Sequence, residues 1–94
     1  MIVWGGSNLA DALDTGGRYN PAADAWMAVS PAGAPSRRDS HTAVWAGGEM
    51  IIWGGYGASI YHTNTGGRYN PTTNSWADTS TGANVPPGRA YHTA

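Results

Sequence analysis

The feature that most constrains this chain is an internal repeat that runs through nearly all of its 94 residues. The segment MIVWGG at 1–6 returns as MIIWGG at 50–55, which is an offset of 49 residues. The segment TGGRYNP at 15–21 returns unchanged at 65–71, which is an offset of 50 residues. The chain therefore contains two copies of a unit of about fifty residues, and units of this kind bury their faces against neighbouring units.

The composition favours short strands over helices. The chain has five Trp, five Tyr and fourteen Gly but no Phe. Large aromatic rings set among glycines and turn residues are typical of strands. Gly and Pro also interrupt every window that is long enough for three helical turns. We therefore expect an all-β fold.

The better-preserved unit divides into four predicted strands, which we call a to d in chain order. They are expected at 40–46, 49–55, 65–70 and 75–80. Gly47 and Gly48 suit a tight hairpin between a and b, because glycine tolerates the positive φ that such turns need. The sequence PTTN at 71–74 suits a turn between c and d.

Strands a and b read as continuous apolar runs, with Val44 and Trp45 in the first and Met50, Ile51 and Ile52 in the second. A strand with one wet face would alternate between apolar and polar residues. Continuous runs therefore predict burial on both faces. The blades of a propeller meet that demand, because each inner strand lies between neighbouring blades.

These residues resemble the kelch repeat family. The family has an Arg and a His before strand a, an apolar run that ends in Gly-Gly, then Tyr-Asp-Pro and a later Trp. One copy here supplies MIIWGG together with Arg38, His41, Tyr69 and Trp76. The other copy supplies MIVWGG together with Tyr19, Trp26, Arg89 and His92. Asn20 and Asn70 stand where the family commonly has Asp, and both initiate turns.

The resemblance implies four-stranded antiparallel blades of a kelch-type β-propeller, with strand a nearest the central axis. We expect 1–94 to form a single two-blade fragment. Blade 1 would have strands b to d at 1–30, and blade 2 would have strands a to d at 39–80. The C-terminal strand a at 90–94 would complete a blade of an adjacent subunit.

Two blades leave apolar flanks and unpaired strand edges, which invite pairing with another chain. Propellers have about four to eight blades, and the resemblance implies six or seven, so we favour closure as a homotrimer with a homotetramer as the alternative. Such head-to-tail contacts stop growing only when the ring closes. The expected subunit interface comprises Met1, Ile2, Val3, Trp4, Tyr91, His92, Thr93 and Ala94.

The long loops, b to c and d to a, are expected at one end of the blades. Loops on a rigid scaffold usually carry binding, so this end is the candidate ligand or pore face. The candidate residues are Arg38, His41, Tyr56, Tyr61, His62, Arg89 and His92.

Four of these candidates have both a functional and a structural interpretation. His41 and His92 either form a ring of imidazoles that binds a metal or an anion, or make structural hydrogen bonds before strand a. Arg38 and Arg89 either bind carboxylates or sugars, or tie the d to a loop to backbone carbonyls or a neighbouring blade. We prefer the structural interpretation for all four. The repeated Tyr and Trp residues, Trp26 and Trp45 among them, are expected to pack.

Several function classes find no support in the sequence. Lys and Arg total 5 against 6 for Asp and Glu, so there is no basic patch for nucleic acid. No apolar run could span a bilayer, and no segment reads as a signal peptide. The compartment stays open, because a chain without Cys fits either side of a membrane.

No catalytic motif is visible either. TGGRYNP lacks the Lys of a phosphate loop, and neither a Ser-His-Asp nor an H-E-x-x-H arrangement occurs. Copper oxidases with kelch-like propellers rely on a Tyr that is cross-linked to a Cys, and the absence of Cys excludes that chemistry here. We therefore expect no enzyme and no cofactor, but a self-assembling structural or binding scaffold whose protein or small-molecule ligand is unknown. The alternatives are a sugar-processing enzyme with an axial pocket, and an inert fragment of a longer secreted kelch protein.

Overall fold

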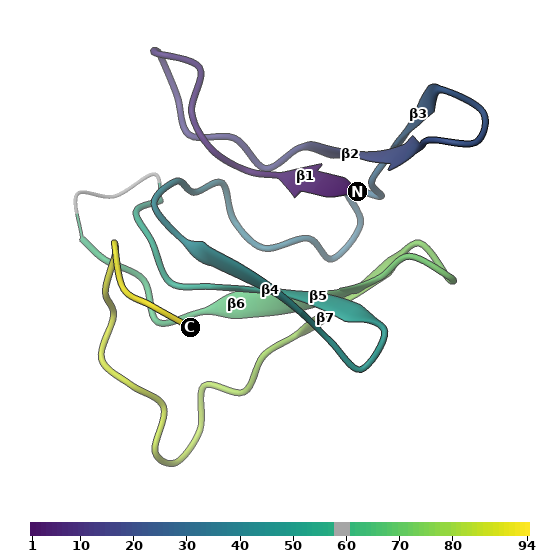
Figure 1. Cartoon of the computed structure of the whole chain (residues 1–94). Coiled ribbons are helices and arrows are strands. Elements are labelled where there is room, and N and C mark those ends of the chain that lie inside the picture. Colours follow the sequence, from purple (N-terminus) through teal and green to yellow (C-terminus); the bar gives the residue numbers. More distant parts are fainter. Residues whose placement is uncertain (58–60) are drawn as a thin grey trace.

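The computed structural model describes residues 1–57 and 61–94, and over these stretches it is all-β with no helix (Figure 1). The first sheet contains, in spatial order, β1 (Ile2–Trp4), β2 (Gly16–Asn20) and β3 (Ala25–Ala28). The second sheet contains β4 (Thr42–Ala46), β5 (Glu49–Trp53), β6 (Gly66–Asn70) and β7 (Ser75–Asp78). All neighbouring strands are antiparallel. The prediction of an all-β chain with antiparallel sheets is confirmed.

The two sheets repeat the same register. Tyr19 of β2 lies opposite Trp26 of β3, and Tyr69 of β6 lies opposite Trp76 of β7. The ring centroids of these pairs are 5.1 Å and 5.0 Å apart. Cross-strand aromatic pairs of this kind stabilise a sheet beyond the area that they bury. The sequence repeat is therefore a structural repeat, with the first sheet lacking the counterpart of β4.

Tight turns close one end of the sheets. Gly47 and Gly48, between β4 and β5, have φ values of 60° and 79°. This pair of positive values is what a two-residue hairpin needs and what glycine permits. The turns before β3 and β7 end at Asp24 and Asn74, with φ values of 48° and 49°. Asp and Asn tolerate this left-handed conformation better than other residues with a side chain.

Strand a is shorter than the predicted range of 40–46, because β4 begins only at Thr42. Ser40 has a φ of 58°, and a left-handed residue cannot continue a strand. The described chain forms no strand at 90–94. Tyr91, the repeat equivalent of Ser40, has nearly the same φ of 55°. The C-terminal segment therefore takes the conformation that precedes β4 in the other copy.

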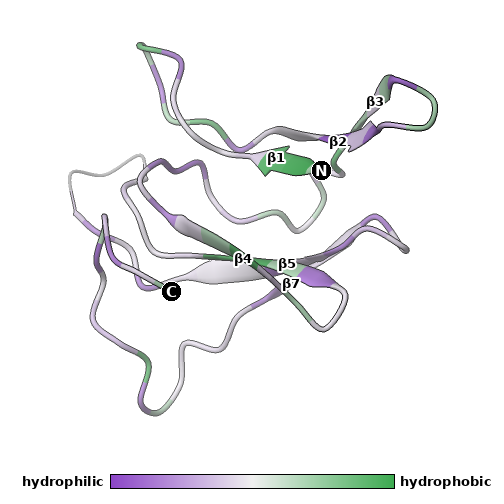
Figure 2. Ribbon diagram, viewed as in Figure 1, coloured by the Kyte–Doolittle hydropathy of each residue, from purple (hydrophilic) through white to green (hydrophobic). Residues whose placement is uncertain are grey.

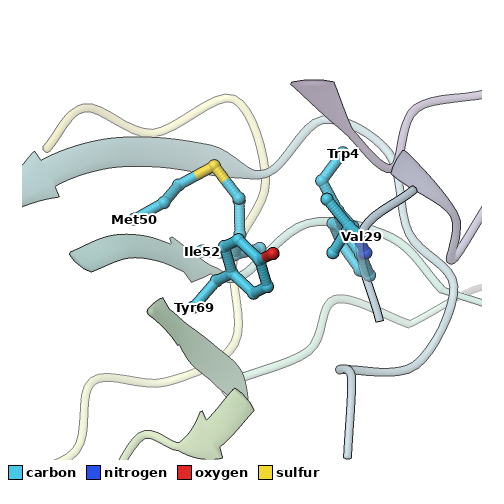
Figure 3. Packing of buried hydrophobic residues seen from close by; sticks show 5 residues of the cluster. All are labelled: Trp4, Val29, Met50, Ile52 and Tyr69. Atoms are coloured by element: carbon cyan, nitrogen blue, oxygen red, sulfur yellow. The ribbon is translucent and has the colours of Figure 1, made fainter. Parts of the chain in front are cut away.

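The core joins the two sheets. Trp4 and Val29 from the first unit are buried together with Met50, Ile52 and Tyr69 from the second sheet. Figure 3 shows the last three residues gathered on one side of the cluster and the first two on the other. In Figure 1 the connection from β3 to β4 runs between the two sheets. The second sheet therefore depends on the first for part of its burial.

Strand b of the second sheet, β5, has no exposed residue, but burial on both faces is not found for strand a, β4. Trp45 of β4 is 62% exposed and Trp26 of β3 is 56% exposed, although both were expected to pack. Val44 and Met1 are also exposed, and Figure 2 shows apolar colouring over β1 and part of β4. The reason is geometric, since only one of the two flanks of each sheet faces another sheet. Over 1–57 and 61–94 we also find no helix with the length and apolarity of a membrane span.

The first prediction concerns Gly55, whose φ is 93° and whose missing side chain makes room for another segment. A Cβ there would collide with the carbonyl oxygen of Asp39 and lie 2.9 Å from the backbone nitrogen of His41. Gly48 has a φ of 79° but nothing within 4 Å of such a Cβ. Both Gly→Ala changes carry the left-handed penalty of about 1–2 kcal/mol. Gly55→Ala should lower the free energy of unfolding by about 2 kcal/mol more than Gly48→Ala.

Urea unfolding of the two variants, followed by tryptophan fluorescence, checks this prediction. Equal unfolding midpoints for the two variants would show that the Asp39 to His41 segment does not pack on Gly55.

Candidate functional site

The long loops meet at one end of the sheets, as the antiparallel order predicts. The backbone N–H of Gly6 donates to the carbonyl of Arg38 at 2.9 Å, and the N–H of Arg38 donates to the carbonyl of Leu13 at 3.1 Å. Asp39 and Tyr56 exchange two backbone hydrogen bonds, both of 2.9 Å. The connection between the sheets is thus held by a loop of the first sheet and by a loop of the second.

Arg38 lies at the centre of this arrangement and is only 1% exposed. Its Nη1 donates to the carbonyls of Gly54 and Thr65, at 3.1 Å and 2.6 Å. Its Nη2 donates to Thr65 Oγ1 at 2.9 Å and to Ser36 Oγ at 3.1 Å, and its Nε donates to the Ser36 carbonyl at 3.0 Å. A guanidinium has five N–H donors, so these five bonds leave none for a ligand.

Arg38 therefore acts as a clamp. Its backbone bonds to the first sheet's loop at Gly6 and Leu13, and its guanidinium bonds to the second sheet at Gly54 and Thr65. Burial lowers the pKa of Arg38, but the group stays charged because an arginine does not deprotonate in proteins. These contacts favour the structural interpretation of Arg38.

His41 is half-buried and packs edge-on against Trp4, with ring centroids 5.8 Å apart. A Cβ at Gly5 would lie 2.9 Å from the His41 ring, so the first Gly of the Gly-Gly pair makes room for the imidazole. Burial, followed by the charge of Arg38, lowers the pKa of His41, while a hydrogen bond with the Trp4 backbone and the charge of Asp39 act in the opposite direction. His41 is therefore a neutral packing residue at neutral pH.

The C-terminal segment repeats this pattern on the second sheet. His92 packs edge-on against Trp53 with centroids 5.3 Å apart, and its Nε2 lies 3.0 Å from Thr42 Oγ1. The carbonyl of Arg89 accepts a 2.8 Å bond from the N–H of Gly55, as that of Arg38 does from Gly6. The side chain of Arg89, however, is exposed.

The remaining candidate residues lie on the exposed loops. The Tyr56 and His62 rings are 4.6 Å apart, with 2.9 Å between the hydroxyl and Nε2. The Tyr91 ring is 6.0 Å from that of Tyr56. Tyr61 is exposed and lies beside residues 58–60, which are outside the described part. Tyr56, His62 and Tyr91 therefore form an aromatic cluster at the loop end, and Tyr91 was not among the residues predicted for this face.

A groove of about 580 Å³ lies elsewhere, beside the edge of β1. Met1 and Ile2 line one side, and Ala43, Val44 and Trp45 of β4 line the other. The sequence reasoning placed Met1 and Ile2 at a subunit interface but did not predict a groove. The signal available was the pair of apolar runs that contribute to its lining, at 1–3 and 43–45.

The acids and histidines of the described residues do not form a cluster that could hold a metal ion. Within the described residues, no three His, Asp or Glu side chains come together. Arg68 Nη1 lies 3.5 Å from Glu49 Oε1 in an exposed ion pair. Tyr19 donates to Asp24 at 2.7 Å. Glu49 and Asp24 are therefore each paired with a different side chain, on different sheets.

A comparison of the chain with protein-family models and with curated proteins finds no match. The likeness to kelch repeats therefore depends on the repeated motif residues themselves.

The second prediction concerns the clamp. Arg38→Met keeps the length of the side chain but removes all five donors and leaves the Gly54 and Thr65 carbonyls without this partner. Because hydrogen bonds from a charged group contribute about 1.5–3 kcal/mol each, the free energy of unfolding should fall by about 3 kcal/mol or more. Arg37→Met, at the exposed neighbouring position, should change it by less than about 0.5 kcal/mol. Similar losses in both variants, measured by urea unfolding, would contradict the clamp.

The third prediction is a pH dependence of stability. Folding lowers the pKa of His41 below its ordinary value of about 6.5, so the unfolded chain binds this proton more readily than the native chain. The contribution of His41 to stability is then full above about pH 7 and is lost as the pH falls through the folded pKa. His41→Gln should flatten the decline of unfolding free energy between about pH 7 and pH 5. An unchanged slope in a folded His41→Gln variant would contradict this role.

Proposed function

We propose that this chain is a non-enzymatic scaffold of the kelch type, whose copies assemble head to tail into a closed β-propeller. Each sheet would be one blade. The observation that carries the proposal is a comparison within the chain. Ile52 on β5 is 0% exposed, whereas its repeat equivalent Val3 is 52% exposed on β1. An apolar side chain at the same repeat position is covered in the sheet that has a strand a and open in the sheet that lacks one.

The groove supports the same proposal. It runs along the edge of β1 and is lined on its other side by exposed residues of β4. An apolar, unpaired strand edge is a ready template for another strand. The C-terminal segment of a neighbouring copy would pair with this edge, and the register of β4 with β5 would place its Thr93 opposite Trp4 and its Ala94 opposite Val3.

Ring closure sets the expected copy number. Two blades in each copy, and propellers of about four to eight blades, allow a dimer, a trimer or a tetramer. The six-bladed trimer is the size that the kelch resemblance favours, and an eight-bladed tetramer is the alternative. A head-to-tail interface of this kind uses two different surfaces and saturates only when the last copy meets the first.

A binding face would lie at the loop end, where Tyr56, His62 and Tyr91 cluster. Arg38 and His41, the residues that a sugar-processing enzyme would need for substrate, instead make contacts inside the fold. Their use in packing favours the scaffold over the enzyme.

The fourth prediction is the mass of the chain in solution. Sedimentation equilibrium at micromolar concentration should give three times the chain mass of 9.8 kDa, with no larger species as the concentration rises. A constant mass of two or four chains would still agree with a closed ring, but the ring would then have four or eight blades. A folded monomer throughout, or growth without limit, would contradict closure.

A further inference from the structure

The contact between the two sheets, which we call the inner seam, is built from directional hydrogen bonds. Arg18 Nη1 of the first sheet donates to the carbonyl of Pro71 at 3.3 Å. Trp76 Nε1 of the second sheet donates to the carbonyl of Ser30 at 3.0 Å, and the N–H of Ser30 donates to Asn74 Oδ1 at 3.0 Å. Each bond joins one unit to the unit that follows it.

Every group in these bonds has a repeat equivalent on an outer flank. The equivalents of Arg18 and Ser30 are Arg68 and Ser80, which belong to the second unit. The equivalents of Pro71, Trp76 and Asn74 belong to the first unit and are Pro21, Trp26 and Asp24. Each equivalent keeps its chemistry, including Asp24, whose carboxylate accepts a hydrogen bond as the Asn74 side-chain oxygen does. One flank of the chain thus carries hydrogen-bonding groups that are complementary to those on the opposite flank of another copy.

The residues at the inner seam are more buried than their repeat equivalents on the outer flanks. Trp76 is half-buried at the inner seam, where its ring centroid is 5.4 Å from that of Trp4. Trp26, at the equivalent place on the outer flank, is 56% exposed. The equivalent of Trp4 is Trp53, which is only half-buried. The outer flanks therefore present both halves of the same tryptophan contact.

Arg89 is prearranged for such a contact. Its Nε donates to the carbonyl of Pro87 at 3.2 Å, as Arg38 Nε does to Ser36 at 3.0 Å. Its carbonyl is bonded to Gly55 in the way that the Arg38 carbonyl is bonded to Gly6. Among the described contacts, no bond from Nη1 or Nη2 of Arg89 is found, whereas these atoms in Arg38 make four.

The acceptors that would complete Arg89 lie on the far flank. The repeat equivalents of Gly54 and Thr65 are Gly5 and Thr15, in the loop between β1 and β2. The N–H of Gly5 bonds to the Thr15 carbonyl at 3.0 Å, and that of Gly54 bonds to the Thr65 carbonyl at the same distance. The two acceptor sites are therefore built in the same way.

The surroundings of Gly6 also indicate a missing neighbour at this flank. Its φ of 92° equals that of Gly55 within a degree. The face of Gly55 is closed by Asp39 and His41, whereas no described atom lies within 4 Å of a Cβ at Gly6. The equivalents of the two closing residues belong to the Arg89 segment, as Ala90 and His92.

We propose that the seam between copies reproduces the inner seam, with Arg89 of one copy donating to the Gly5 and Thr15 carbonyls of the next. Trp26 then donates to Ser80, and Arg68 donates to Pro21, across the same boundary. This inference depends on the proposed ring and names its partner as a second copy of this chain. The register of β4 with β5 places Thr93 opposite Trp4 and Ala94 opposite Val3, so Tyr91 and His92 precede the paired residues.

Cross-linking tests the pairing of flanks directly, since the chain has no Cys of its own. Ala23→Cys and Ser80→Cys are made separately, refolded together and treated with a short bis-maleimide. Ser30→Cys with Thr73→Cys in one chain is the matched control at the inner seam and fixes the length of the reagent. The mixture should give a covalent dimer, and either variant alone should give none.

The double variant Ala23→Cys/Ser80→Cys should cross-link up to the copy number of the ring and no further. Self-linking of either single variant would overturn the proposal, because it would mean that like surfaces meet. So would an associated mixture that does not cross-link although the inner control does.

Association measurements test the arginine. Arg89→Gln should weaken association about tenfold or more, while Arg37→Gln, which removes the same charge from the equivalent loop, should leave it within about twofold. A monomeric wild-type chain would mean that the proposed ring itself is wrong. A wild-type oligomer that Arg89→Gln does not weaken would leave the ring standing and overturn the Arg89 contact.

Discussion

The packing of the two sheets depends on one buried arginine. Arg38 bonds through its backbone to the loop of the first sheet and through its guanidinium to the carbonyls of the second. Burying a charge is costly unless its donors are all paired, and here all five are. The clamp fixes the distance between the sheets, so that Trp4 and Val29 pack against Ile52 and form one core.

The Gly-Gly pairs and the His residues follow from that clamp. The arginine segment can approach the preceding sheet only where the backbone has a positive φ and no side chain, as at Gly5 and Gly54. The imidazole that directly precedes the next apolar strand then fills the space against a Trp, as His41 does. The spaced motif of Arg, His and Gly-Gly is thus one packing device, which is complete at Arg38, whereas the copy at Arg89 repeats only its backbone and His contacts within the chain.

The repeat predicted much of the fold but less of the site. Strand order, antiparallel pairing and the tight turns follow from local chemistry, and all can be inferred from residues such as Gly47 and Asn74. The left-handed residue at Ser40 carries no such signal, and β4 is shorter as a result. Exposure of Trp26 and Trp45 could not be predicted either, because composition tells whether a residue suits burial and not whether a neighbour is present. Arg38 and Arg89 show the same limit, since their sequence patterns match and their surroundings differ.

The central claim is that a neighbouring copy completes the sheet at the edge of β1. Hydrogen exchange of the Trp4 amide, followed across the concentration range over which the mass changes, tests it most directly. The account predicts that protection of this amide, which the register places opposite Thr93 of the next copy, rises as the chains associate. Rapid exchange of the Trp4 amide in the fully associated state would contradict it, because the edge would then remain unpaired in the oligomer.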